Sequence, residues 1–494
     1  MDLIDAKFSQ PDKQALLRGL LAILPKEAVL HEREALKPYE CDALTVYRNL
    51  PLAVVLPSSE EQVAAILRLC RDLAVPVVAR GAGTGLSGGA MPHDQGIVLS
   101  MAKFNRILSI DPLSRTARVQ PGVRNLAISD AARPSGLYFA PDPSSQIACT
   151  IGGNVAENSG GVHCLKYGLT VHNILAVRAY TIDGDLLEIG GGALDAPGFD
   201  LLALVTGSEG LLCVITEVTV RLLPTPVKAR AVLAAFDRIE QAGQAVADVI
   251  AAGIIPAAME IMDKAVTRVV EDYVHAGYPL DAEAILIVES DGTEEEVEDE
   301  IERIGAVLQR AGASQLRVSQ SEEERYKIWS GRKSAFSALG RFSADYYCID
   351  GTVPRKQLAT ILRAIGQMEK KYGLRCANVF HAGDGNLHPL IMFDASKPGE
   401  LERTEAFAAE ILELSVALGG TITGEHGVGV EKINQMCVQF AQPELQMFHA
   451  VKRAFDSSGL LNPGKAVPAL HRCAEYGRMH VHSATPAHPE LLRF

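Results

Sequence analysis

Three segments rich in glycine and small polar residues lie within the first 212 residues, and they constrain the fold more than any other feature. They are RGAGTGLSGG (Arg80–Gly89), APDPSSQIACTIGGNVAENSGG (Ala140–Gly161) and TGSEGLL (Thr206–Leu212). Glycines let backbone N–H groups crowd around an anion. Each segment alone is also typical of a loop with tight turns. Three of them in one region favour a single large phosphorylated cofactor.

The first segment has the spacing G-x-G-x-x-G, as Gly83, Gly85 and Gly88. In a nicotinamide-binding Rossmann turn, this motif runs directly into a helix whose N-terminus meets the pyrophosphate. Here AMPHDQG follows, with Pro92 and Gly96 and no helical pattern. The context therefore argues against a Rossmann domain.

Length and composition narrow the class of protein. A chain of 494 residues predicts two or three domains. Acidic residues (60) outnumber basic ones (47) and no basic run occurs, which disfavours a nucleic-acid partner. No membrane-spanning stretch or signal-peptide layout is visible, so a cytoplasmic protein is expected. The nine cysteines form no C-x-x-C pair, which favours reduced buried thiols over a cysteine-held iron–sulfur cluster.

The pattern of apolar residues changes near Pro224 and Pro226, which suggest a domain boundary. Before it, Ser58 and Glu61 have capping-box spacing at the start of an expected helix, and residues 75–80 read as a strand. After it, helical patterns lie at about 234–252, 294–311, 355–371, 400–417 and 443–455, and strand patterns at 284–290, 345–350, 377–380 and 387–393. This alternation predicts helices layered on one sheet.

The segment HAGDGNLHPL begins at His381 and contains a second histidine, His388. Asp384-Gly385 is a favoured centre for a two-residue hairpin. Counting outward places the two histidines directly opposite each other, with Cβ atoms about 5 Å apart, so that both rings can bind one ion. Two structural histidines at a turn are the alternative.

A second segment, ITGEHGVG, adds Glu425 and His426 between glycines. Two histidines and one glutamate suit a divalent ion such as zinc or manganese, with one coordination position open. An ordinary turn pair is the alternative for Glu425 and His426.

In combination, these motifs resemble a known family. RGAGTGLSGG, DPSS…TIGGNVAENSGG and GSEGLL…ITEVTVRLLP resemble the PCMH-type FAD domain of the vanillyl-alcohol-oxidase superfamily. GDGNLHP, GEHGVG and LNPGK are similar to its D-2-hydroxy-acid dehydrogenase branch. Across essentially the whole chain, YECDAL, VFHAGDGNLHPL, EKINQMC, LHRCAEYG and MHVH resemble the FAD-linked subunits of bacterial glycolate oxidases.

The resemblance implies an α+β architecture. An N-terminal helical segment (1–48) precedes a PCMH-type FAD-binding domain (49–226). A ferredoxin-like α+β substrate and metal domain follows, the FAD-linked oxidase C-terminal domain (227–466), with a C-terminal helical segment that returns to the flavin. The His- and Pro-rich residues 467–494 form a tail.

The resemblance also implies noncovalent FAD, because the pyrophosphate loop has no histidine for covalent attachment. The implied flavin contacts are Gly81, Ala82, Gly83, Thr84, Gly85, Leu86 and Ser87 in that loop, then Pro141, Asp142, Thr150, Gly153, Asn158 and Gly161, then Glu209, Gly210, Val214 and Ile215 at the adenine end, and Asn462. Cys213 stands where the family usually has glycine. If that position needs a positive φ, FAD affinity would be reduced.

In the resembling dehydrogenases, residues matching His381, His388 and Glu425 bind a divalent metal, zinc or manganese. The residue matching His426 acts on the substrate, and the one matching Arg332 binds its carboxylate. The apolar or weakly polar Phe336, Cys348 and Leu390 favour a small monocarboxylate over a dicarboxylate.

The implied reaction is oxidation of a small 2-hydroxy acid by hydride transfer from C2 to FAD, glycolate to glyoxylate or D-lactate to pyruvate. The implied partners are a second FAD-domain subunit and an iron–sulfur subunit that pass electrons to quinone. Such a complex would hold the protein at the inner face of the cell membrane. A D-lactate dehydrogenase is the near alternative, and a non-catalytic flavin-carrying assembly subunit is the alternative from another class.

Overall fold

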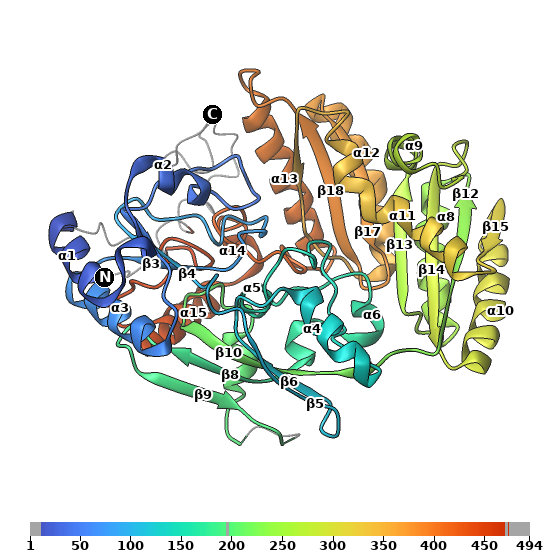
Figure 1. Cartoon of the computed structure of the whole chain (residues 1–494). Coiled ribbons are helices and arrows are strands. Elements are labelled where there is room, and N and C mark those ends of the chain that lie inside the picture. The colour runs from blue at the N-terminus through green and yellow to red at the C-terminus, as the bar shows by residue number, and fades with distance from the viewer. Residues whose placement is uncertain (1–10, 194–196, 470–472, 474–494) are drawn as a thin grey trace. The chain divides into compact units, whose positions relative to one another are not determined.

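The computed structural model describes residues 11–193, 197–469 and 473, and the chain forms two compact units (Figure 1). The first unit takes the described residues up to Gly160, Leu169–Pro224 and those from His426 onward. The second takes Gly161–Gly168 and Thr225–Glu425. The predicted bounds place 426–466 with the second domain, whereas the contacts group this segment with the first unit. The predicted tail, 467–494, lies outside the described residues except for 467–469 and Cys473.

The first unit begins with α1 (Lys13–Ile23) and the short α2 (Arg33–Leu36), which lie in the segment predicted to be helical. A four-stranded sheet follows, in the order β1-β2-β4-β3, with β2, β4 and β3 parallel. Its strands are β1 (Val29–Leu30), β2 (Ala53–Val55), β3 (Val77–Arg80) and β4 (Ile97–Ser100). Leucines of α1 and α3 (Glu60–Asp72) form one apolar core with these strands.

Helix α3 begins one residue later than the capping box predicted. Ser59 is the N-cap, and its side chain accepts the N–H of Gln62. The predicted cap, Ser58, instead donates its backbone N–H to the side chain of Gln62. The acidic Glu60 and Glu61 fill the first turn, where they complement the helix dipole.

A five-stranded antiparallel sheet completes the first unit, in the order β5-β6-β10-β8-β9. Its strands are β5 (Ile107–Asp111), β6 (Thr116–Val119), β8 (Ile174–Tyr180), β9 (Leu186–Gly190) and β10 (Val214–Arg221). Buried residues alternate along β10, so one face packs against α4 (Asn125–Ala132), α5 (Ile151–Glu157) and α7 (Leu201–Val205). The short strands β7 (Leu137–Tyr138) and β11 (Leu223–Pro224) pair with each other, and the unit also contains α14 (Met436–Gln439) and α15 (Gln442–Phe455).

The second unit is built on a seven-stranded antiparallel sheet in the order β15-β12-β14-β13-β17-β18-β16. The strands are β12 (Lys228–Phe236), β13 (Ala258–Asp263), β14 (Ala284–Gly292), β15 (Gln315–Val318), β16 (Asp345–Cys348), β17 (Arg375–His381) and β18 (Asn386–Phe393). The four strand patterns predicted in this half correspond to β14, β16, β17 and β18.

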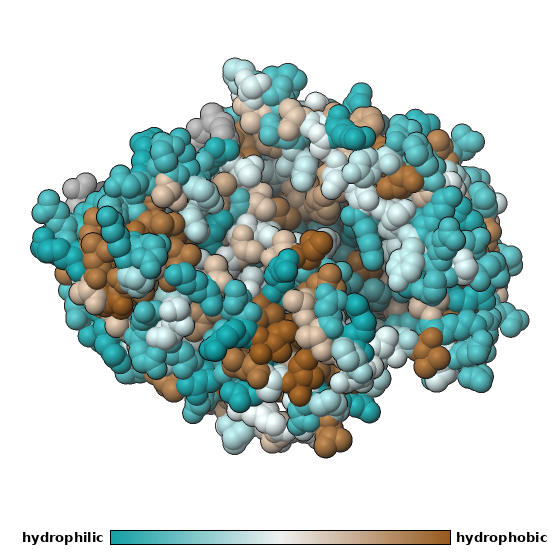
Figure 2. Space-filling model, in the orientation of Figure 1, coloured by the Kyte–Doolittle hydropathy of each residue, from teal (hydrophilic) through white to brown (hydrophobic). Residues whose placement is uncertain are grey.

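Helices cover both faces of this sheet. They are α6 (Cys164–Tyr167), α8 (Ile239–Ala251), α9 (Lys264–Val274), α10 (Glu294–Arg310), α11 (Glu322–Leu339), α12 (Leu358–Tyr372) and α13 (Glu400–Ala417). Ser290 donates to Glu300 of α10, whereas the preceding residue, Glu289, bonds to α11, so α10 and α11 lie on opposite faces. Helix α10 presents a mainly hydrophilic outer surface (Figure 2).

The helices predicted in this half are present, and the largest shift is at α8. This helix begins at Ile239 rather than near 234, because residues 228–236 form β12. The elements that were predicted thus have the right type and differ only at their ends, whereas β12, β13, β15, α9 and α11 were not predicted.

Two of the nine cysteines form a disulfide. Cys437 of α14 and Cys473 form a disulfide with a Cα–Cα distance of 5.2 Å, so the expectation of reduced thiols throughout is wrong for this pair. The remaining seven cysteines form no disulfide. Among the helices of the described ranges, none is long and apolar enough to cross a membrane.

Candidate active site

The hairpin of β17 and β18 brings His381 and His388 together, in a register that differs from the predicted one. His381 pairs with Asn386, and His388 pairs with Val379. The turn is longer than two residues, because the carbonyl of His381 accepts the N–H of Gly385. The observed and predicted registers differ by two residues, and an even difference keeps the two histidine side chains on the same face of the sheet. The ring centroids lie 5.0 Å apart and the rings are nearly perpendicular.

Glu425 completes a three-residue cluster. Its Oε1 atom lies 3.2 Å from Nε2 of His381 and 3.0 Å from Nε2 of His388. The three potential ligand atoms all lie within 4.8 Å of one another. Nδ1 of His381 contacts Glu260 at 2.7 Å, and Nδ1 of His388 contacts the carbonyl of Ile349 at 3.3 Å. Such outer partners are typical of metal-binding histidines, so the donor set fits a divalent ion.

Asp350 holds the segment that carries Glu425. Its fully buried carboxylate accepts the N–H groups of Gly424 at 3.0 Å and of Glu425 at 3.2 Å, and the hydroxyl of Thr423 at 2.6 Å. A Cβ at Gly424 would collide with the side chain of Asn386 on β18. The glycine and Asp350 together allow this loop to lie close to the hairpin.

The charges of the cluster reinforce one another. Burial alone would lower the pKa of His381, but the charge and hydrogen bond of Glu260, with those of Glu425, hold it well above its ordinary value. Burial would raise the pKa of Glu425, but hydrogen bonds to His381 and His388 hold it well below its ordinary value. Burial raises the pKa of Asp384, in the turn, to about 6. Three carboxylates, those of Glu260, Glu425 and Asp384, therefore lie in this region and favour a cation.

Arg332 of α11 lies beside the cluster and is only 2% exposed. Its Nε donates to Oε2 of Glu260 at 2.6 Å. Its Nη2 is buried and has no hydrogen-bond partner among the residues that the structure describes. A buried guanidinium nitrogen without an acceptor is costly, so this atom fits an anionic ligand such as a carboxylate.

The predicted pyrophosphate loop, 81–87, directly follows β3 in the first unit. Gly83 has φ +71°, and a Cβ at Gly81 would collide with the Thr150 hydroxyl. The buried hydroxyls of Ser87 and Thr150 have no hydrogen-bond partner within the described part of the chain. Close backbone approach and unused hydroxyls fit a phosphorylated cofactor.

Three predicted flavin residues other than glycine adopt the left-handed backbone region: Asn158 at φ 52°, Glu209 at 51° and Asn462 at 44°. The side chain of Asn462 donates to the carbonyl of Glu209 at 2.6 Å. The Glu209 carboxylate accepts the N–H groups of Val428 and Gly429, each at 2.7 Å. The structure therefore brings GSEG, GVG and LNPGK together. The Glu209 carboxylate thus ties the GSEG segment to the GVG segment.

Cys213 is not strained. Among the described residues, it is absent from those with positive φ. The condition under which Cys213 would reduce FAD affinity is therefore not met. Burial raises the pKa of its thiol to about 12, so it serves as an apolar residue of the core.

His426 follows Glu425 directly, at the point where the chain enters the first unit. The next residue, Gly427, has φ +81°, and a Cβ there would collide with the carboxylate of Glu157. The sequence therefore needs glycine after the histidine. The role of His426 stays a prediction.

Comparisons with known proteins identify the family. An FAD binding domain matches residues 51–190, and the FAD linked oxidases C-terminal domain matches residues 225–466. Glycolate oxidase subunit GlcD of Escherichia coli (strain K12) is 59% identical over 99% of this chain and 98% of that protein. The chain belongs to the FAD-linked oxidase family. D-lactate dehydrogenase of Archaeoglobus fulgidus is a more distant relative, 34% identical over 84% of this chain and 91% of that protein.

Solved structures agree with the predicted fold class. The crystal structure of p-cresol methylhydroxylase with substrate bound has a TM-score of 0.79 and 18% identity, and it covers 93% of this chain and 97% of that one. The 4-ethylphenol oxidase of Gulosibacter chungangensis has a TM-score of 0.77 and 17% identity over 94% of this chain and all of that one. The α+β, PCMH-type architecture is confirmed. This member of the FAD-linked oxidase family is an FAD-dependent oxidoreductase.

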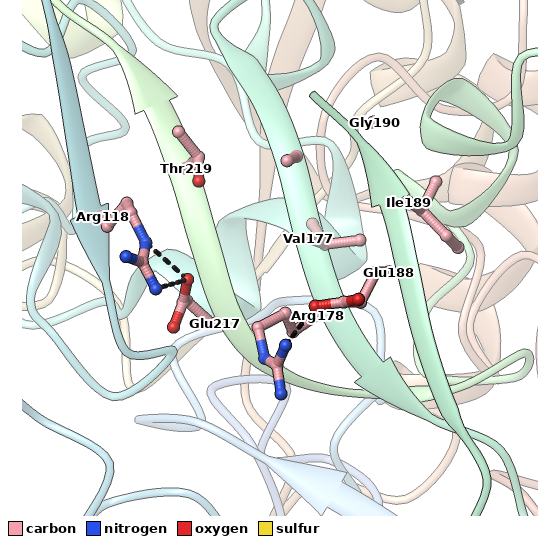
Figure 3. Close-up of a pocket in the computed structure, with 9 residues that line it drawn as sticks. Arg118, Val177, Arg178, Glu188, Ile189, Gly190, Glu217 and Thr219 are labelled. Carbon is pink, nitrogen blue, oxygen red and sulfur yellow. Dashed lines mark hydrogen bonds and ion pairs between the residues drawn. The ribbon is translucent and has the colours of Figure 1, made fainter. Parts of the chain in front are cut away.

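A depression of about 360 Å³ on the five-stranded sheet holds none of the predicted site residues of this FAD-linked oxidase (Figure 3). Arg118 pairs with Glu217 at 2.8 Å, and Arg178 pairs with Glu188 across neighbouring strands. Because these charges already neutralise each other, the depression is an outer sheet surface rather than an active site.

Sequence reasoning missed two buried carboxylates of the site, Glu260 and Asp350. The available signal was an acid next to or within an apolar run: Glu260 lies in AAMEIM, and Asp350 follows YYCI. Such an acid is rarely buried unless it is paired.

Proposed function

We propose that this FAD-linked oxidase oxidises a small 2-hydroxy acid, glycolate to glyoxylate, with D-lactate to pyruvate as the second candidate. The observation that carries the proposal is the buried, unpartnered Nη2 of Arg332 beside the His381–His388–Glu425 cluster. A carboxylate and an adjacent hydroxyl are the two groups that such a pair of sites would bind. The names of the GlcD and D-lactate dehydrogenase relatives support both substrates.

Each residue would have a defined task. Arg332 would hold the substrate carboxylate by charge-assisted hydrogen bonds. His381, His388 and Glu425 would hold a zinc or manganese ion, which when bound would lower the pKa of the substrate hydroxyl. His426 would take the hydroxyl proton, and noncovalent FAD would accept the C2 hydride. Phe336, Cys348 and Leu390 offer no second cation for a dicarboxylate.

Electrons would leave through partners. The relatives are named as subunits of glycolate oxidase, which supports assembly with further chains. We propose a second FAD-domain subunit and an iron–sulfur subunit that pass electrons to quinone at the inner face of the cell membrane. A non-catalytic assembly role for this chain is the competing proposal, and the buried cluster argues against it.

The test is anaerobic reduction of the bound flavin. Purified protein with FAD and Mn²⁺ should lose its flavin absorbance when glycolate or D-lactate is added, and should reduce a dye acceptor. The ratio of kcat/KM for the two acids ranks them. No reduction with either acid would refute the proposal.

The variant His388→Ala should abolish turnover while FAD stays bound, because a ligand of the proposed metal is lost. His449→Ala is the control, since His449 is equally buried in α15 but lies outside the cluster and contacts the carbonyl of Pro468. Turnover by His388→Ala at the wild-type rate would remove the metal from the proposal.

A further inference from the structure

Glu260 occupies an unusual position for a charged residue. It lies in the middle of β13, is fully buried, and is flanked by Met259 and Ile261. Strands β14 and β17 pair with β13 on its two sides, and Glu260 is directly opposite His381. A carboxylate taken out of water at the centre of a sheet needs strong compensating partners.

Both oxygens of Glu260 bind residues of the proposed active site. Oε1 lies 2.7 Å from Nδ1 of His381, and Oε2 accepts from Nε of Arg332 at 2.6 Å. His381 is 3% exposed and Arg332 is 2% exposed. One buried anion therefore connects a proposed metal ligand with the proposed carboxylate-binding residue.

Each contact fixes what its partner can do. When Nδ1–H of His381 donates its hydrogen bond to Glu260, a neutral ring has its lone pair on Nε2, the atom near Glu425. The bond to Nε of Arg332 uses one edge of the guanidinium and leaves the buried Nη2 for a ligand. A rigid acceptor between the two would set the spacing between metal and carboxylate sites.

We infer that Glu260 is a positioning residue that couples metal binding to recognition of the substrate carboxylate. The inference rests on the proposed function and deepens it. It assigns to one residue two measurable properties, the tautomer of His381 and the orientation of Arg332. A residue that only balanced the charge of Arg332 would influence neither metal affinity nor the histidine.

Glu260→Gln is the sharpest variant, because an amide accepts at only one end. If its NH₂ group faces Arg332, two donors meet. If it faces His381, it donates to Nδ1 and forces the proton to Nε2, which can then no longer bind a metal. Either orientation breaks one half of the coupling while the side-chain shape is preserved.

Glu289→Gln is the matched control. Glu289 is also buried on the sheet, but Arg325 and Trp329 share its Oε2, and His163 lies by its Oε1 at 3.4 Å. A glutamine oxygen can serve Arg325 and Trp329 while its NH₂ faces His163, which can accept. This variant therefore removes a buried charge of the same kind without touching the proposed site.

The experiment titrates Mn²⁺ into metal-free, FAD-loaded full-length protein and follows free Mn²⁺ by its paramagnetic resonance signal. If the amide NH₂ of Glu260→Gln faces His381, Mn²⁺ binding should weaken by about 10–100-fold, whereas Glu289→Gln should not change it. If the NH₂ faces Arg332 instead, KM for glycolate should be raised even at excess Mn²⁺, because Arg332 is misplaced. Equal Mn²⁺ affinity and KM in the two variants would overturn the inference.

A second variant, Glu260→Asp, tests the inference if Glu260→Gln folds poorly. Glu260→Asp keeps the charge, but its shorter side chain cannot span both partners, so Mn²⁺ affinity or KM should still worsen; wild-type values for both would overturn the inference. The wild-type protein separates the two proposals. If it neither binds Mn²⁺ nor oxidises a 2-hydroxy acid, the proposed function fails. If it does both and the Glu260 variants match it, only the inference fails.

Discussion

Glu260 and Glu289 are two buried glutamates on neighbouring strands of one sheet, and they differ in what surrounds them. Glu260 on β13 pairs with Ile287, two residues before Glu289 on β14, so both side chains point to the same face. Each receives an arginine from α11, and these arginines, Arg332 and Arg325, are two helical turns apart. Sequence and burial alone would not distinguish the two pairs.

The two arginines differ in how many of their side-chain nitrogens have a hydrogen-bond partner. Arg325 bonds through all three nitrogens, to Glu289 and to Glu322. Arg332 keeps a buried Nη2 without a partner among the described residues. A satisfied buried ion pair anchors α11 to the sheet, whereas an incompletely satisfied one indicates a ligand site.

Replacing the two arginines should give the largest contrast. Arg332→Ala should lower kcat/KM for the 2-hydroxy acid by about 1,000-fold, since each charge-assisted hydrogen bond contributes about 1.5–3 kcal/mol. Arg325→Ala should leave kcat/KM unchanged and lower the thermal midpoint. Arg332→Lys keeps the charge without the planar fork and should lie between Arg332→Ala and wild type. Equal losses in Arg332→Ala and Arg325→Ala would remove the distinction between the two pairs.

Replacing Glu289 should reduce the stability of the second unit more than it reduces the activity of the protein. Glu289→Ala leaves Arg325 and the indole N–H of Trp329 without their shared acceptor, at an expected cost of about 3 kcal/mol. Trp329 is the only tryptophan in the chain, so its fluorescence during denaturation reports on this cluster. Trp329→Phe, followed by circular dichroism, should cost less, about 1–2 kcal/mol. A large change in KM for either variant would contradict a purely structural role.

Local sequence patterns predicted many of the helices and strands around these glutamates, but not the position of Glu260. The periodicity of α10 and α13 and the Asp-Gly turn were readable because they depend on residues close in sequence. The register of the hairpin was wrong by two residues, because the turn closes through the carbonyl of His381 rather than around Asp384-Gly385 alone. That error left the side-chain face unchanged, so the meeting of His381 and His388 was still predicted correctly.

Glu260 could not be placed from the sequence, because its partners are 72 and 121 residues away. Their meeting depends on the order of β14, β13 and β17 in the sheet and on where α11 crosses it. The flavin contacts were predicted in a different way from the strands, helices and histidines. They were carried over by resemblance to a family, and the structure adds that Glu209 and Asn462 meet each other through Glu209's carbonyl.

The smallest effect should appear in the pH dependence of stability. Burial alone would raise the pKa of Glu289, but the hydrogen bond and charge of His163 and the charge of Arg325 hold it below its ordinary value of 4.5. The unfolded state then binds a proton more readily than the folded state, so this contribution is complete above about pH 4.5 and is lost as the pH falls through the lowered pKa.

The difference in thermal midpoint between wild type and Glu289→Gln should therefore be largest at neutral pH and shrink below about pH 4.5. Melting curves followed by Trp329 fluorescence across this pH range measure the difference. The other carboxylates are the same in both proteins, so their contributions to the thermal midpoint cancel. A difference that grew on acidification would mean that the folded protein holds Glu289 protonated. The charged pair with Arg325 would then not be what anchors α11, and the contrast with Glu260 would need another cause.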